Sequence, residues 1–191
     1  MKHLFPLAFL LAACAEPVAA PIPEAPTFTG DNLWTVQTAT VNFTGTQEGT
    51  PFTGTFADVA VDIDLDPDAP EDGRIRAVIA PASASTADAE RDRALPTRDW
   101  FSTKAFPTAT WESDSITRTS DGYLARGELT LKGVTRPADL PFALDVIGNT
   151  ARASGTLTLQ RQDYGVGAGA YSTDQWIAFP VRVDVEVEAV R

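Results

Sequence analysis

The sequence is short of the side chains on which most active sites depend. Its 191 residues include one cysteine, one methionine and one histidine, and the last two are Met1 and His3 at the extreme N-terminus. Catalytic triads that need histidine, histidine-ligated zinc, and haem with His or Met ligands are therefore excluded for the rest of the chain. A general base at neutral pH would have to be a carboxylate, lysine or tyrosine with a perturbed pKa. This composition favours a protein that is not an enzyme.

Positive charge and long apolar runs are also scarce. The chain has 15 basic and 26 acidic residues, a net charge of −11, and an acidic surface repels nucleic acid and anionic lipid. We therefore expect no nucleic-acid partner. The run from Leu4 to Ala13 is too short to cross a bilayer, which needs about 20 residues, but it suits the hydrophobic part of a secretion signal.

The leader ends in Leu11-Ala12-Ala13-Cys14, and small residues immediately before a cysteine resemble the bacterial lipobox. We interpret residues 1–13 as a lipoprotein signal peptide and Cys14 as the lipidation site; an ordinary signal peptide with an incidental Cys14 is the alternative. Residues 14–32 would then be a lipid anchor and a Pro/Ala-rich tether, because such a composition stays extended and cannot pack. Ala15 in place of an aspartate slightly favours the outer membrane. The expected location is periplasmic, with the chain attached to a membrane through its anchor.

From residue 33 onward, apolar and polar residues alternate with the period of half-buried strands. The most informative stretch, 127–142, reads as two alternating runs joined by a turn at Gly133. We predict an all-β fold: an eight-stranded antiparallel barrel with one short helix at 87–94, capped by Ser85 or Thr86, and a helical turn at 98–103. The predicted strands are 33–43, 52–65 with a β-bulge between Phe56 and Val59, 74–80, 108–119, 122–132, 138–147, 151–161 and 175–190.

Four motifs in order resemble the YceI-like family of bacterial proteins. They are LKGVTRP at 131–137, AERD at 89–92 followed by Leu95 and by DWF at 99–101, the segment 106–113, and RQDYGVG at 161–167. The resemblance covers residues 33–191 and implies a lipocalin-like barrel in the periplasm that binds a polyisoprenoid or another long-chain lipid. No covalent cofactor is expected beyond the N-terminal acyl lipid.

One segment departs from many members of the family. Residues 44–55, TGTQEGTPFTGT, together with the DWF segment, look like a branch found beside or fused to cytochrome b561-type membrane proteins. That resemblance suggests an isoprenoid quinone as the ligand and a membrane cytochrome as a possible partner.

Aromatic residues are the candidates for contact with such a lipid, because several fall in the non-strand segment that would cover a barrel mouth. Arg161 and Tyr164 are polar enough to meet a headgroup there. Each aromatic is also a candidate for ordinary core packing. The predicted ligand-binding residues are Phe52, Phe56, Trp100, Phe101, Phe106, Trp111, Arg161, Tyr164 and Trp176.

Whether the barrel is hollow stays open at this point. The small inward candidates Gly127, Ala151, Ala153 and Gly155 leave room for one elongated ligand, or they fit the taper of a filled barrel. A filled barrel would be a non-catalytic interaction module that docks onto a membrane redox system.

Catalysis and metal binding are the least favoured interpretations. A carboxylate-dependent enzyme would need a pair such as Asp92 and Asp99, but the arginines around them favour a salt-bridged surface. No metal site is expected either. The DIDLDPD segment at 62–68 resembles the start of a calcium loop, yet Pro67 and Gly73 occupy the places of that loop's glycine and glutamate.

Overall fold

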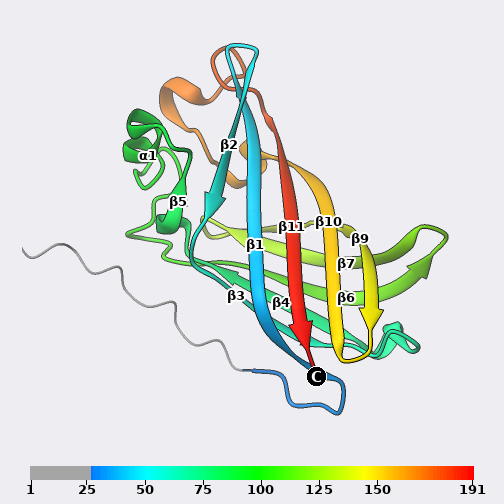
Figure 1. Ribbon diagram of the computed structural model, residues 1–191. Helices are drawn as coiled ribbons and strands as arrows, with labels where there is room; N and C mark the ends of the chain where they lie inside the picture. Colours follow the sequence, from blue (N-terminus) through cyan, green and yellow to red (C-terminus); the bar gives the residue numbers. More distant parts are fainter. Residues whose placement is uncertain (1–26) are drawn as a thin grey trace, which may run out of the picture.

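The alternating segments pair into a closed ring of antiparallel strands (Figure 1). The computed structural model describes residues 27–191. The predicted signal peptide, the lipidation site Cys14 and most of the tether lie outside the described residues. The strands are β1 (Leu33–Gln47), β2 (Thr50–Phe56), β3 (Val59–Asp64), β4 (Arg74–Ile79), β5 (Ala84–Ser85), β6 (Ala109–Thr119), β7 (Gly122–Leu131), β8 (Val134–Pro137), β9 (Leu140–Ile147), β10 (Thr150–Gln160) and β11 (Pro180–Val190).

The ring closes because β1 pairs on one side with β11 and on the other with β2 and β3. From β11 the pairing continues through β10, β9, β7, β6, β4 and β3 back to β1. β2 and β3 share one place in this ring, and β8 and β9 share another beside β7. The result is the predicted eight-stranded antiparallel barrel, which leaves few strand edges unpaired.

The segment 52–65 corrects one prediction. It is not one bulged strand but two, β2 and β3, separated at Ala57 and Asp58. The backbone N–H of Ala57 donates to the Ser83 carbonyl (3.3 Å), and that of Asp58 donates to the Ser83 hydroxyl (3.0 Å). Ser83 thus takes over the hydrogen bonds that a continuous strand would have made, and the face of the chain changes there.

Two strand boundaries also differ from the predicted ones by four or more residues, and the helix cap differs as well. β1 continues to Gln47, and β11 begins at Pro180 instead of Gln175. The helix α1 (Ala89–Ala94) is capped by Asp88, whose carboxylate accepts from the N–H groups of Glu90 and Arg91, and not by Ser85 or Thr86. The segment 98–103 forms turns and not a helix.

The predicted hairpin at 127–142 is present, with a two-residue turn between β7 and β8. Lys132 and Gly133 have positive φ angles of 52° and 75°, as a type I′ turn requires. This turn matches the right-handed twist of the strands and fixes their register, with Leu131 opposite Val134.

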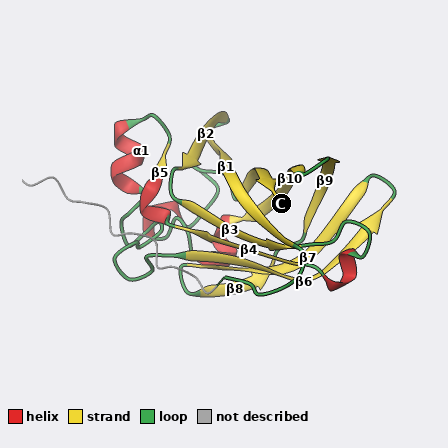
Figure 2. Cartoon of the chain, turned by 60° about the horizontal axis from the view of Figure 1, so that its bottom comes forward, coloured by secondary structure: helices red, strands yellow, loops and turns green. Residues whose placement is uncertain are grey.

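Two apolar clusters occupy the two ends of the barrel. One contains Trp34, Trp111 and Ile116, and the other contains Phe43, Leu95, Phe101, Tyr164 and Val166. The second cluster includes Leu95, which follows α1, and packs against Ala84 of β5; α1 and β5 lie side by side at one end of the molecule (Figure 2). Within residues 27–191, no helix is long and apolar enough to cross a membrane.

Candidate ligand-binding cavity

The barrel encloses a cavity of about 420 Å³ between its two end clusters. This volume lies within the range of about 300–1,000 Å³ that is usual for small-molecule sites. The two longest runs of the wall come from neighbouring strands, because every second residue of a strand faces inward. On β10 and β11 the inward-facing lining residues are Ala151, Ala153, Gly155, Leu157, Leu159, Val181, Val183, Val185, Val187 and Ala189, and Ser154 also contributes to the wall.

The cavity is elongated along the barrel. The lining residues of β10 run from Ala151 to Leu159, which at 3.3–3.4 Å per residue is about 27 Å of strand. A tilt of 35–45°, as in closed barrels, reduces this to roughly 20 Å along the axis. A chain-like molecule fits such a shape better than a compact one.

Two small residues on β10, Ala153 and Gly155, lie in the cavity wall beside β9. A Cβ on Gly155 would lie 2.8 Å from the Pro141 carbonyl and 2.9 Å from a methyl group of Leu140. Ala153 faces Leu144 on β9 and Val187 on β11, and all three line the cavity. Larger side chains at these positions would either displace β9 or fill the interior.

Two tryptophans of the first cluster, Trp34 and Trp111, line the cavity. The indole N–H of Trp34 donates to the Leu65 carbonyl (2.9 Å), and that of Trp111 donates to the Ala138 carbonyl (2.7 Å). Their polar atoms are therefore satisfied by the wall, and both rings line the interior. Ile116 is fully buried in the same cluster.

Aromatic rings surround the opposite end. Phe56 lies between Phe43 and Phe101, with ring centroids 5.2 Å and 5.9 Å away. Leu95, from the end of α1, and Trp100 also line the cavity there. These contacts place the α1 segment over the mouth; in Figure 1 α1 lies beside β5 and β2.

Arg161 organises the loop that covers the rest of the mouth. It is only 4% exposed, and its guanidinium donates to the carbonyls of Ala178, Val166, Gly167, Thr173 and Ile177 at 2.7–3.2 Å. A guanidinium has five N–H donors, so all of them serve the segment 166–178. Burial lowers the pKa of Arg161 from its usual value, but an arginine remains charged at neutral pH.

The two covering segments are tied together through Asp99. Its backbone carbonyl accepts from the N–H groups of Gly167 and Ala168, both at 2.8 Å. The ammonium of Lys132 donates to the Gly165 carbonyl at 2.6 Å. The segment 165–169, which contains three glycines, is therefore part of the cover over the barrel mouth.

The structure separates the predicted ligand-binding residues into two groups. Phe52, Phe56, Trp100, Phe101, Trp111, Arg161 and Tyr164 line the cavity. Phe106 instead lies against Gly133, where an added Cβ would be 2.6 Å from its ring, and Trp176 is 46% exposed outside the cavity. Arg161 has no free donor for a headgroup, because the covering loop uses all five.

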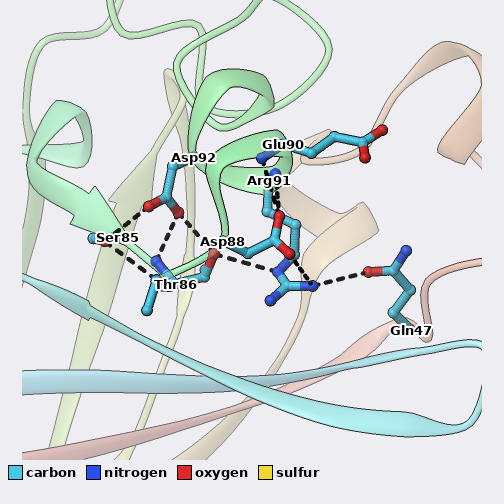
Figure 3. Close-up of polar contacts among 8 residues, drawn as sticks. Gln47, Ser85, Thr86, Asp88, Glu90, Arg91 and Asp92 are labelled. Atoms are coloured by element: carbon cyan, nitrogen blue, oxygen red, sulfur yellow. Dashed lines mark hydrogen bonds and ion pairs between the residues drawn. The ribbon is translucent and has the colours of Figure 1, made fainter.

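The carboxylates around α1 hold local structure together (Figure 3). Asp92 accepts from the Ser85 hydroxyl (2.8 Å) and from the backbone and side chain of Thr86 (2.7 Å each). The hydrogen bonds from Thr86 lower the pKa of Asp92, and the backbone hydrogen bond from Arg91 lowers that of Asp88. Both groups are ionised at neutral pH and are poor proton shuttles.

Sequence reasoning missed two kinds of cavity residue. The aliphatic wall of β10 and β11 was visible in the inward-facing positions Leu157, Leu159, Val181 and Val183, but apart from Arg161 the predicted ligand contacts were all aromatic. Gln47 and Arg91 also line the mouth. No local pattern distinguishes them from other surface residues, because they meet only when α1 folds over β1.

An antiparallel eight-stranded barrel around an apolar cavity defines a lipocalin-like binding barrel. Residues 34–189 match the YceI-like domain, and the chain belongs to that family. A UPF0312 protein of Photorhabdus laumondii is 36% identical over 87 residues, 46% of this chain and 45% of that protein. A UPF0312 protein of Yersinia pestis is 36% identical over 96 residues, 50% of each. The chain spans about half the length of the curated relatives it matches.

Solved structures share the fold. BcnA of Burkholderia cenocepacia is 25% identical, with a TM-score of 0.77 over 80% of this chain and 96% of that one. A domain from Saccharophagus degradans, described as polyisoprenoid binding, is 16% identical, with a TM-score of 0.63 over 83% of this chain and 97% of that one. At that identity the second likeness concerns the fold alone.

Proposed function

We propose that the barrel binds one long-chain lipid of the polyisoprenoid or isoprenoid-quinone class and holds or carries it without catalysing a reaction. The elongated cavity, with its almost wholly apolar wall, is the observation that carries this proposal. The Saccharophagus degradans domain described as polyisoprenoid binding supports the same ligand class.

The energetics favour an occupied interior. Each CH₂ group transferred from water into such a wall contributes about 0.8 kcal/mol, so a prenyl tail gains affinity along its whole length. Core substitutions show that an empty cavity destabilises a protein by about 24 cal/mol per Å³. An empty void of 420 Å³ would therefore lower the free energy of unfolding by roughly 10 kcal/mol. This is an upper bound, since the mouth admits water, but it is large beside the stability of a domain.

The proposed setting is the bacterial periplasm, with the barrel attached to a membrane by an acylated Cys14, and the outer membrane is slightly favoured. The leader and the residues before Cys14 support this proposal. A tether of the kind expected at 14–32 would let the mouth reach a membrane surface from which a lipid is taken.

A second candidate function is a non-catalytic module that docks onto a membrane redox system of the cytochrome b561 kind. Trp176 and Tyr171 favour it, because these large aromatics of the covering loop are 46% and 37% exposed. Exposed aromatics are common at protein contacts. The two functions are compatible if the partner exchanges the lipid.

Organic extraction of the protein purified from its native envelope, followed by mass spectrometry, tests the proposal. We expect one isoprenoid lipid per chain. A folded sample that carries no stoichiometric lipid and takes up no isoprenoid quinone would exclude the carrier function. The docking function would survive that result if the protein still captured a membrane cytochrome.

A further inference from the structure

The mouth of the cavity contains one guanidinium whose donors are not all used, that of Arg91 on α1. Its Nε donates to the Thr86 hydroxyl (3.3 Å) and its Nη1 to the side-chain oxygen of Gln47 (3.4 Å). Nη1 also lies 3.6 Å from the Asp88 carboxylate. Figure 3 shows this side chain extending from α1 toward Gln47. Among the described residues, Nη2 of Arg91 and Nε2 of Gln47 have no acceptor.

The contacts of Arg91 hold these donors in place. Its guanidinium carbon lies 4.7 Å from the centre of the Phe52 ring, and its side chain is 30% exposed. Arg91, Gln47 and Phe52 all line the cavity. Free N–H groups are therefore presented beside the end of an apolar wall, where the polar end of a bound lipid would emerge.

The charges around the mouth are already balanced. The carboxylates that line the cavity are Asp88 and Glu90, and the guanidiniums are Arg91 and Arg161. Because Arg161 has no free donor, Arg91 is the only cation among the described cavity-lining residues that can meet an incoming oxygen. Phosphates and diphosphates are usually bound by several charged donors at once, and two carboxylates nearby would repel them.

We infer that the headgroup lies against the unused donors of Arg91 (Nη2) and Gln47 (Nε2), and that it is an uncharged hydrogen-bond acceptor, such as a quinone or ester carbonyl, and not a phosphate. This inference rests on the proposed function, because it assigns the polar end of the lipid whose tail fills the barrel. It also assigns the headgroup to Arg91 of α1 instead of Arg161 and Tyr164, the two residues expected from the sequence to meet it.

Three ligands with the same tail test this: farnesyl acetate, farnesyl diphosphate and the hydrocarbon farnesene. For the unmodified protein we expect a dissociation constant for the acetate about 10- to 100-fold below those of the other two, as for a hydrogen bond from a charged donor. This ranking needs no variant. A tighter diphosphate, or an acetate no better than farnesene, would overturn the inference.

Arg91→Met should remove the preference by weakening acetate binding to the level of farnesene, with farnesene binding unchanged. Arg93→Met is the matched control, because Arg93 is exposed on the same helix and should leave all three constants unchanged. If Arg91→Met weakened farnesene as much as the acetate, Arg91 would be a packing residue and the inference wrong. If none of the three ligands bound the unmodified protein, the proposed function itself would fail.

Discussion

Ala153→Trp is the substitution that most directly asks whether the interior is the binding site. Ala153 lines the cavity near the middle of β10, between Leu144 and Val187 on the neighbouring strands. Its side chain already points inward, so a larger one extends into the void. Gly155 is a poorer choice, because any Cβ there would lie 2.8 Å from the Pro141 carbonyl and would disturb β9.

The size of the effect follows from the area that the new ring covers. A buried tryptophan covers about 150–250 Å², which at about 25 cal/mol per Å² is equivalent to roughly 4–6 kcal/mol of apolar contact. A bound tail loses at most the lower of these values, about 4 kcal/mol of binding free energy, because it can bend around the ring. We therefore expect the dissociation constant of farnesene to rise between tenfold and roughly a thousandfold.

Folding should be little affected. Overpacking a filled core costs about 1–3 kcal/mol, but here the ring enters space that no side chain occupies. The melting temperature should therefore change little, or rise if the indole packs well.

Equilibrium binding followed by intrinsic tryptophan fluorescence measures the effect, with thermal unfolding as the check on structure. Thr158→Trp is the matched control, because Thr158 lies on the same strand but is exposed to solvent. It should bind farnesene as the unmodified protein does. A folded Ala153→Trp protein with unchanged affinity would refute the argument that the ligand occupies the barrel interior.

Three further substitutions or conditions test the ends of the barrel. Trp111→Phe should lower the free energy of unfolding by about 1–3 kcal/mol, because the buried Ala138 carbonyl loses its donor; Trp176→Phe, at an exposed site, should change it by less than about 0.5 kcal/mol in the same denaturant titration. Arg161→Lys should cost more than about 3 kcal/mol and make the segment 166–178 sensitive to protease, since an ammonium has three donors for five carbonyls; an unchanged digestion pattern would contradict the bracing role of Arg161. The free energy of unfolding should decrease as the pH is lowered below about 4, because Asp88 and Asp92 have lowered pKa values in the folded state. The unfolded chain therefore binds more protons than the folded protein in that pH range. Asp92→Asn should reduce the slope, and an equal slope in both proteins would show that Asp92 is not one of the groups responsible.

The strands were predictable from the sequence because their signal is local. Alternation places Val181, Val183 and Val185 on one face whatever the rest of the chain does, and the same holds for Leu157 and Leu159. The turn at Lys132 and Gly133 is equally local. These features define an antiparallel sheet with one apolar face, which is why the barrel class could be inferred.

The interruptions of the strands were not predictable, because they depend on distant partners. The break between β2 and β3 exists because Ser83 supplies the acceptors for Ala57 and Asp58. The helix cap depends on the geometry at Asp88, while Ser85 and Thr86 bind Asp92 instead. Neighbouring polar residues such as these have similar propensities for capping.

The sequence by itself determined which residues face inward and that the inward face is apolar, because side-chain direction in a strand follows from a period of two. Only the tertiary structure decided that the inward faces surround a cavity, since this depends on how the strands close into a ring and on inward residues, such as Ala153 and Gly155, that are too small to fill it. It also decided that Arg161 braces the cover and that Arg91 retains free donors, because hydrogen-bond partners are set by where separate segments meet.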